Sequence, residues 1–475
     1  MKRTVVWLTA LALSLTGCMV GPNYKRPAVA TPQQFRGAPA GDTSPNATPG
    51  AAAPDSIAET KWFDLFQDDT VKQLVTSALE KNFDLRIAAE RVLEARAQYG
   101  IVRANLLPTL DGQVQFEATR GSSIGATRFI PPGATFSSSY TQATFNLNWE
   151  LDLWGRLRRL NESARAQYLA TEEARNGVKL SLIGDVMNTY FALREQDLEL
   201  QISQQTGDIA NDNLRLINLR HDRGAANALD VHQAEQFLYT ATAQVASSQR
   251  AIGESENALS LLLGNAPSDV PRGKVLDQIA APPQLPPGLP SSLIERRPDI
   301  RQAEQNLIAA NAQIGAARAL LFPQISLTGL LGGQSRALTN LFTTPARLAT
   351  ITPSALIPIF HAGLRSGVRL TEAQQREALI TYEKAIYAAL REVSDAFIVH
   401  DRTREQRIEE EKLVTALTQS VELSTLRYRG GLDSYLQVLD AERNLFGGQL
   451  TLAQLRLQEL QSVVQLYRAL GGGWQ

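Results

Sequence analysis

The chain has 475 residues, of which 44% are hydrophobic and 20% are charged, and its 47 basic and 48 acidic residues nearly cancel. Such a balance gives no electrostatic support for binding nucleic acid, which depends on concentrated positive charge. Cys18 is the only cysteine, so a disulfide within the chain is excluded.

The first residues, MKRTVVWLTALALSLTGC, have the pattern of a secretory signal. A basic start precedes an apolar run from Val5 to Leu15 that is too short to span a membrane as a helix. The LTGC that ends at Cys18 resembles the bacterial lipobox, in which cleavage before the cysteine lets it carry acyl chains. We therefore expect a signal peptide at 1–17 and a lipoprotein with a palmitate-bearing Cys18.

The segment that follows the signal has the composition of an extended tether. Residues 28–60 are rich in Ala, Pro, Thr and Gly, so we expect a lipidated N-terminal tether over 18–60. Met19, where some lipoproteins carry aspartate, favours sorting to the outer membrane by resemblance to other lipoproteins. Several acyl chains anchor a protein stably, whereas one chain does not.

Two segments, 109–120 and 140–154, alternate polar and apolar side chains and are joined by a loop rich in Gly, Ser, Thr and Pro. Period-two alternation predicts strands with one apolar and one polar face. No apolar run of 18 residues follows the signal, so a crossing of the membrane would have to use strands. A soluble two-sided sheet would leave Trp149 and Trp154 at a wet surface.

Prolines are absent from 133–266 and after Pro358, so these intervals can hold very long helices. Residues 156–222 favour helix throughout, and a helix of that length rises about 100 Å. Helices this long are typical of coiled coils or repeats, which directs attention to internal duplication.

The chain aligns with itself. LRHDRGAANALDVHQAE from Leu219 matches LRYRGGLDSYLQVLDAE from Leu426 at an offset of 207 residues, and AQYGIVRANLLPTL from Ala97 matches AQIGAARALLFPQI from Ala312 at an offset of 215. We expect two copies of one unit, each with a helix, a strand pair, a long helix, a tip and a further helix. The expected bounds are 61–266 and 299–475 for the copies, 267–298 for a proline-rich connector, and 323–333 and 347–360 for the second strand pair.

Four strands are too few for a closed barrel. Backbone polar groups cannot stay unpaired in lipid, and the smallest outer-membrane barrels have about eight strands. The sequence alone therefore predicts an assembly of more than one chain.

Four further segments carry a resemblance to a known family: CMVGPNYKRP from Cys18, WFDLFQDDTVKQLVTSALEKNFDLRIAAERV from Trp62, LPSSLIERRPDIRQAEQNL from Leu289, and RYRGGLDSYLQVLDAERNLF from Arg427. With them the chain resembles the outer-membrane factors of bacterial tripartite efflux systems, the OprM-like, NodT-type lipoproteins of the TolC superfamily. The RRPDI within the third segment is especially specific, and its proline and aspartate suit a helix start.

The resemblance implies a mixed, mostly α fold: a homotrimer whose twelve-strand outer-membrane β-barrel continues into a twelve-helix periplasmic α-barrel, with the connector in an equatorial belt. It implies a passive exit duct for drugs or other small toxic solutes, and hence multidrug resistance. The implied partners are a periplasmic adaptor (membrane fusion protein), an inner-membrane RND-type pump and outer-membrane lipid.

The resemblance also implies where function resides. The tips around Gly224 and Gly431 would dock the adaptor, since glycine suits a turn between antiparallel helices. A second set would form the periplasmic gate: Leu436, Asp440, Arg443 and Tyr428. The TolC pattern has a second acid at the position of Gln437 and an arginine at the position of Asp433. Because this sequence departs from the pattern at both positions, we expect a weaker acidic ring and a different latch between the closed tips.

Catalysis finds no support in the sequence. The four histidines form no i,i+4 pair, no metal-ligand constellation is visible, and no phosphate-binding loop occurs. We therefore expect no enzyme, metal or cofactor, with the driving energy supplied by the inner-membrane partner.

Three alternatives remain open at this point. An outlet for type I protein secretion, or one for metal ions, would share the channel architecture; a copper outlet would favour a Met-rich lumen, and the chain has three Met. A lipid-anchored structural coiled-coil protein would explain the helices, but it would leave the apolar faces of the strands unburied.

Overall fold

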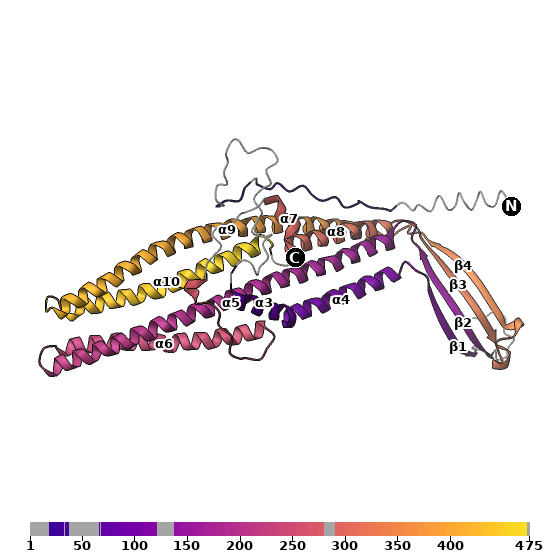
Figure 1. The fold of residues 1–475 in the computed structure, drawn as a ribbon. Coiled ribbons are helices and arrows are strands. Elements are labelled where there is room, and N and C mark those ends of the chain that lie inside the picture. Colours follow the sequence, from indigo (N-terminus) through magenta and orange to yellow (C-terminus); the bar gives the residue numbers. More distant parts are fainter. Residues whose placement is uncertain are drawn as a thin grey trace. The chain divides into compact units, whose positions relative to one another are not determined.

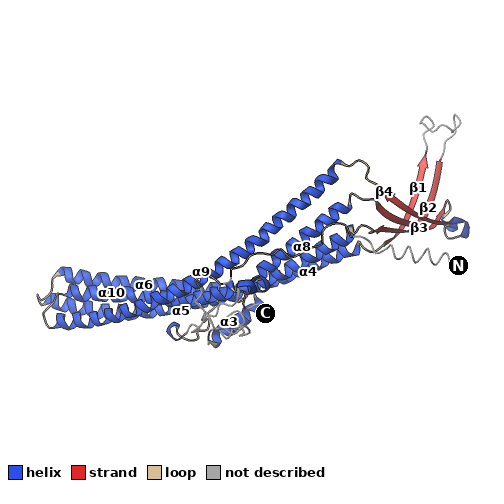
Figure 2. Ribbon diagram, turned by 90° about the horizontal axis from the view of Figure 1, so that it is seen from above, coloured by secondary structure: helices blue, strands red, loops and turns tan. Residues whose placement is uncertain are grey.

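The computed structural model describes residues 19–32, 34–37, 66, 68–120, 137–279 and 290–472. Most of these residues are helical, and the strands form one sheet (Figures 1 and 2). The expected signal peptide, Cys18 and most of the tether lie outside the described residues.

The elements in chain order are α3 (Asp69–Lys81), α4 (Phe83–Ala104), β1 (Thr109–Arg120), β2 (Ser137–Leu151), α5 (Arg156–Asp222), α6 (Ala228–Leu262), η2 (Leu276–Gln278), η3 (Pro290–Ser292), α7 (Leu293–Arg296), α8 (Pro298–Ala319), β3 (Gln324–Ser335), η4 (Leu338–Asn340), η5 (Thr344–Ala346), β4 (Arg347–Leu356), α9 (Ala362–Arg429) and α10 (Tyr435–Ala469).

The chain divides into two compact units, and each draws on both halves of the sequence. The first contains the described residues of Met1–Pro27, Leu93–Thr171 and Ala303–Tyr382, and the second those of Ala28–Val92, Glu172–Gln302 and Glu383–Gln475. Because α4, α5, α8 and α9 each have residues in both units, the units do not coincide with the two sequence copies.

In the first unit the four strands form an antiparallel sheet in the order β1-β2-β3-β4. The register keeps the two kinds of side chain on separate faces, because side chains alternate along a strand. One row across the sheet is apolar, consisting of Leu110, Leu147, Gly329 and Ile351, and another is polar, consisting of Thr109, Asn148, Thr328 and Thr352. Within the described residues, β1 and β4 are edges with no further strand beside them.

The strand bounds differ by a few residues from the alternating segments. β2 begins at Ser137, opposite Arg120, and ends at Leu151 because the chain turns there, with the amide of Leu153 donating to the carbonyl of Leu151 (2.9 Å). β4 ends at Leu356, whose partner is the first residue of β3. Strand ends are thus set by the neighbouring strand, which periodicity does not show.

The N-terminal described segment, residues 20–26, is bound to the helices of the first unit. Arg159 on α5 is almost fully buried, and its guanidinium donates to the carbonyl of Gly21 (3.2 Å) and to Oδ1 of Asn23 (2.8 Å). Further along, Arg26 forms a bidentate pair with Glu304 on α8 (2.7 Å for each bond). This segment therefore ties α5 to α8.

One contact in this segment leaves no room for a side chain. A Cβ built on Gly21, whose φ is +98°, would lie 2.5 Å from the Cα of Gly315 on α8. Only glycine allows this approach of two backbones at a positive φ. The amide of Val20 also donates to the carbonyl of Trp154 (3.1 Å), just after β2.

In the second unit, α6 and α10 end in the same way. Gly264 and Gly471 follow their last turns at φ +71° and +76°, a left-handed C-terminal cap. The carbonyls of Leu262 and Ala469 accept from the Asn82 amide (2.9 Å) and the Arg297 guanidinium (3.0 Å). The residue before α4 thus caps α6, and the residue before α8 caps α10.

Corresponding elements also have matching bounds. α6 and α10 each have 35 residues and begin 207 positions apart, at Ala228 and Tyr435, while α4 and α8 each have 22 and begin 215 apart, at Phe83 and Pro298. Over the described residues, no helix is both long enough and apolar enough to cross a membrane.

We expect Arg159→Leu to release the N-terminal segment. Removing one partner from a buried charged network costs roughly 3–5 kcal/mol, and here the network holds the backbone of residues 20–23. Trypsin should then cleave after Lys25 at least tenfold faster than in the parent protein, measured by N-terminal sequencing of the product. Arg158→Leu is the matched control, since Arg158 binds Asp152. Equal cleavage rates in both variants would contradict this role of Arg159.

Candidate functional site at the helix tips

The two turns that join the long helices to their partners have the same geometry. Gly224 and Gly431 adopt φ +73° and +74°, with open space around a Cβ at either position. Their amides donate to the carbonyls of His221 (2.8 Å) and Tyr428 (3.0 Å), which closes the last turn of α5 and of α9. A residue with a Cβ would be strained at either position because φ is positive, and not because space for the Cβ is lacking.

The turns differ in how the next helix starts. Before α6, Asn227 accepts from the amide of Asp230 (2.9 Å), and the Asp230 carboxylate accepts from the amide of Asn227 (3.2 Å), a capping box. Before α10, Asp433 instead accepts from the Arg427 guanidinium (3.0 Å), which lowers the pKa of the Asp433 carboxyl. The aspartate identified in the sequence as a departure from the TolC pattern is therefore paired within its own tip.

Leu436 and Asp440 lie one helical turn apart on the exposed side of α10. Leu436 is 48% exposed. Asp440 is exposed as well, and its carboxylate accepts from the Asn444 amide (3.3 Å), a local bond along the same helix. In the described chain these two residues thus present an apolar and an acidic side chain to the exterior of the hairpin.

Arg443 and Tyr428 instead contact the other hairpin. The guanidinium of Arg443 donates to Oε1 of Gln236 on α6 (2.9 Å). The Tyr428 ring lies 4.7 Å from the guanidinium carbon of Arg220 on α5, a cation–π contact. The four expected gate residues therefore divide into two exposed side chains and two that join the α9–α10 hairpin to the α5–α6 hairpin.

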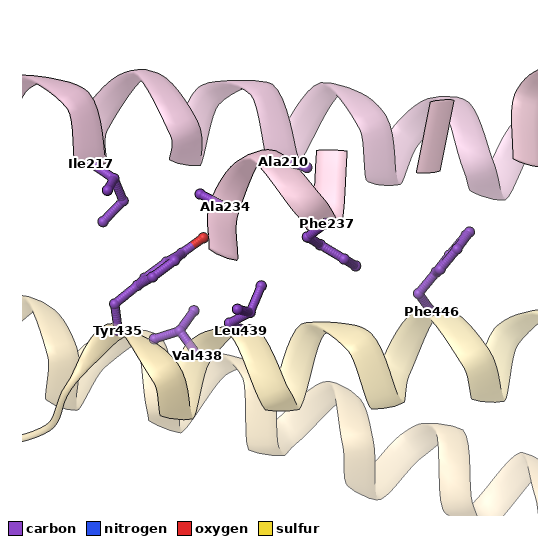
Figure 3. Packing of buried hydrophobic residues seen from close by; sticks show 8 residues of the cluster. All are labelled: Ala210, Ile217, Ala234, Phe237, Tyr435, Val438, Leu439 and Phe446. Atoms are coloured by element: carbon purple, nitrogen blue, oxygen red, sulfur yellow. The ribbon is translucent and has the colours of Figure 1, made fainter. Parts of the chain in front are cut away.

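Below the turns the two hairpins share an apolar cluster (Figure 3). Tyr435, Val438, Leu439 and Phe446 of α10 point toward α5 and α6, where they pack with Ala210, Ile217, Ala234 and Phe237. The rings of Phe237 and Phe446 meet edge to face, with centroids 6.4 Å apart. Burial of large apolar side chains of this kind contributes about 1.5–3 kcal/mol each.

A carboxylate lies within this apolar stripe. Glu442 of α10 is buried, and its Oε1 accepts from the Asn213 amide of α5 (2.8 Å), while its Oε2 is buried without a partner among the described residues. Burial raises the pKa of Glu442 to about 7, and the Asn213 bond lowers it in part. Near neutral pH this carboxyl is therefore close to the midpoint of its titration, inside the contact between hairpins.

Sequence reasoning did not identify Glu442, Asn213, Gln236 or Arg220. The one available signal was the spacing of Glu442 with Val438, Leu439 and Phe446, which places an acid on an apolar helix face. Its partner lies 229 positions away, and a long-range contact of this kind is not visible in local pattern. In the described part of the chain no three His, Cys, Asp or Glu side chains are arranged to hold a metal ion.

We expect Glu442→Gln to remove part of the pH dependence of stability. A carboxyl whose pKa rises on folding, from about 4.5 to about 7, favours the folded state when protonated. Stability should therefore fall as the pH rises through that interval, by up to about 3 kcal/mol per chain at 1.36 kcal/mol per pKa unit. The measurement is the thermal unfolding midpoint by circular dichroism between pH 4.5 and 8.

Glu422→Gln is the control for that experiment, because Glu422 is exposed on α9. Its midpoint should follow the pH as in the parent protein, whereas the midpoint of Glu442→Gln should vary less. The same pH dependence in both variants would show that Glu442 is not the group responsible.

Comparisons with known proteins identify the family of the chain. The family described as "Outer membrane efflux protein" matches residues 74–265 and 289–472. The solvent efflux pump outer membrane protein SrpC of Pseudomonas putida is 40% identical over 464 residues, 97% of each chain. The cation efflux system protein CusC of Escherichia coli is 36% identical over 467 residues, 98% of each chain.

Solved structures share the fold. The open state of the Neisseria gonorrhoeae MtrE outer membrane channel gives a TM-score of 0.84 at 30% identity, over 96% of this chain and 99% of that one. Both the sequence matches and this structural match extend over nearly the whole chain. The chain therefore belongs to the outer membrane efflux protein family, and its place is the outer membrane with an extension into the periplasm.

Proposed function

We propose that the chain is the passive exit duct of a tripartite pump, carrying drugs or other small toxic solutes from the periplasm to the exterior and gated at its periplasmic tips. The observation that carries this proposal is the four-stranded sheet, which has one apolar face, one polar face and, among the described residues, two edges with no further strand. Such a sheet suits lipid on one side and water on the other once its edges are paired.

The assembly that pairs those edges is a homotrimer. Three copies supply twelve strands and, from the long helices and their partners, a twelve-helix α-barrel. The matching bounds of α4 with α8 and of α6 with α10 support an internal duplication at 61–266 and 299–475, with the connector at 267–298. A duplicated chain places two similar hairpins side by side, which suits a ring of six.

The anchor of the mature chain is an acylated Cys18, with the signal peptide at 1–17 removed and 18–60 as a tether. The support in the structure is the segment at 20–26, which is bound to Arg159 and Glu304. The amide of Val20 donates to the carbonyl of Trp154, so the chain two residues after Cys18 is fixed near the end of β2.

The gate consists of Leu436, Asp440, Arg443 and Tyr428. Threefold symmetry would bring three Asp440 carboxylates and three Leu436 side chains together, a cation-focusing ring beside an apolar constriction. The contacts of Arg443 with Gln236 and of Tyr428 with Arg220 support a role in holding the tips together. The turns at Gly224 and Gly431 are the docking points for a periplasmic adaptor, and an inner-membrane RND-type pump supplies the energy.

The relatives leave two classes of cargo to compare. SrpC is named for solvents and CusC for cations. We propose amphiphilic small molecules, because the chain has three methionines in all, which does not suit a methionine-lined route for a soft metal ion. Protein secretion by a type I system is the remaining channel alternative. The duct itself uses no cofactor and catalyses no reaction.

Loss of the chain is expected to make cells hypersensitive to several unrelated amphiphiles. The measurement is the minimal inhibitory concentration across antibiotics, dyes, detergents and metal salts in a deletion strain, with a fall of fourfold or more for the amphiphiles. The intact chain supplied in trans should restore the parent values.

The other possible results of the susceptibility measurements would each indicate a different cargo. Sensitivity confined to metal salts would replace amphiphile efflux with cation efflux. An unchanged panel would refute small-molecule efflux and leave a secreted protein as the cargo to test.

Asp440→Ala trimers should lose cation selectivity or open more often in planar bilayers, because the carboxylate ring is removed from the constriction. The measurements are the reversal potential in a salt gradient and the open probability. Asp433→Ala is the matched control, since Asp433 is paired with Arg427 within its own tip. If selectivity and opening in Asp440→Ala both equal those of the parent, the gate assignment of Asp440 is wrong.

A further inference from the structure

Two carboxyl groups, those of Glu195 and Glu199, lie one helical turn apart on α5, at a level where this helix contacts α6 and α10. Glu195 is 6% exposed, and its carboxyl is hydrogen-bonded to that of Glu199. Among the described residues, no lysine or arginine forms an ion pair with either acid. Burial, and then the charge of Glu199, raise the pKa of Glu195 to about 8. Burying two adjacent acids is costly unless a positive charge accompanies them.

Two glutamine amides approach the Glu199 carboxylate from different helices. Nε2 of Gln244 on α6 lies 3.5 Å from Oε2 of Glu199, and Nε2 of Gln454 on α10 lies 3.5 Å from Oε1. Good N–H···O bonds are about 2.7–3.2 Å long, so both contacts are weak as hydrogen bonds. Oxygen ligands at right angles around a calcium ion, each about 2.4 Å from it, are about 3.4 Å apart. Rotating each amide places its Oε1 where Nε2 is, so the spacing suits ligands of one ion.

A serine hydroxyl at the same level has no partner. Ser248 on α6 is 1% exposed, and its Oγ forms no hydrogen bond among the described residues. Other buried serines of this part of the chain are bonded, such as Ser203, which donates to the carbonyl of Glu199 (2.7 Å). Because α6 returns antiparallel along α5 (Figure 1), Ser248 lies one turn from Gln244 in the direction of Glu195. Its hydroxyl is therefore a buried oxygen directed at the acid pair.

We propose that Glu195, Glu199, Gln244, Ser248 and Gln454 form a binding site for one calcium ion per chain. Two carboxylates balance the charge of the ion, and the amide and hydroxyl oxygens, with water, complete the about six to eight oxygen ligands that calcium takes. Magnesium demands a regular octahedron and suits this irregular set less well. Gln454 is exposed, so the site has an open side through which an ion enters.

The ion would be structural, because it joins α10 to the α5–α6 hairpin beside the apolar cluster that those helices share. The site has two acids and uses neither histidine nor cysteine, so the sequence patterns typical of metal sites do not show it. A proton shared by the two carboxyls is the competing occupant, and it predicts no response to calcium.

The test is the thermal unfolding midpoint of the purified full chain in detergent, first with EDTA and then with about 10 mM calcium chloride. Sites with few charged ligands bind calcium with dissociation constants on the order of 0.1–1 mM, so the midpoint should rise by about 3 °C or more. Glu195→Gln should lose this rise, and Ser248→Ala should keep less than half of it. Magnesium chloride at the same concentration should give less than half of the rise in the parent chain.

Two control variants show whether the effect belongs to this site. Glu405 and Glu409 on α9 have the same spacing, but both are exposed, and they are paired with Arg402 (2.6 Å) and Lys412 (2.8 Å). Glu405→Gln should therefore keep the full rise. Asp440→Ala should keep it too, which separates this site from the proposed ring at the tips.

No rise in the parent chain would leave the acid pair with its shared proton and overturn the inference. An equal rise in the parent chain and in Glu195→Gln would place the ion elsewhere and overturn it as well, and an equal rise with magnesium would overturn the assignment to calcium. In EDTA, Glu195→Gln should unfold at or above the midpoint of the parent chain, which shows that the variant folds. None of these readouts depends on transport, so an unchanged susceptibility panel would refute efflux and leave the calcium site standing.

Discussion

The structure depends on one requirement, that a backbone amide or carbonyl in lipid must have a partner. Among the described residues the requirement is met only between the strands, because no further strand lies beside the outer edges of β1 and β4. A sheet with one apolar face does not remain in lipid with such edges, so in the proposed assembly further copies of the chain would pair them. The long helices would then be present in the same number of copies, since α5 and α9 follow β2 and β4 in the chain.

The same requirement explains why local sequence was informative for the fold. Alternation between Thr109 and Leu151, and again between Gln324 and Leu356, reports directly that each strand has two different surroundings. The absence of proline from the long helices reports continuous backbone bonding. The mostly helical fold with a small sheet could therefore be predicted from the sequence, and the family could be predicted from the resemblance of four of its segments. Strand ends could not, because Ser137 and Leu356 are ordered by residues on the neighbouring strand.

Less of the candidate site than of the fold could be predicted from the sequence. The tip glycines Gly224 and Gly431 were visible because a left-handed turn restricts residue type. The pair of Glu442 and Asn213 was not, because a buried acid on an amphipathic helix resembles any other acid until its surroundings are known. Arg159 is similar, since only the fold brings it beside Gly21 and Asn23. What sequence alone missed are contacts between distant segments that join helices to one another.

The caps at the ends of α6 and α10 are equivalent in position and unequal in chemistry. The uncharged side chain of Asn82 donates a hydrogen bond to the carbonyl of Leu262 and accepts one from the amide of Leu85. Arg297 reaches the carbonyl of Ala469 and the carboxylates of Asp299 and Glu392, and so connects three helices through one charge. In the proposed trimer, neutral and charged joints of this kind would alternate around the ring, so strain applied evenly around it would be relieved at every second joint. The ring of six similar hairpins would then deform with threefold and not sixfold symmetry.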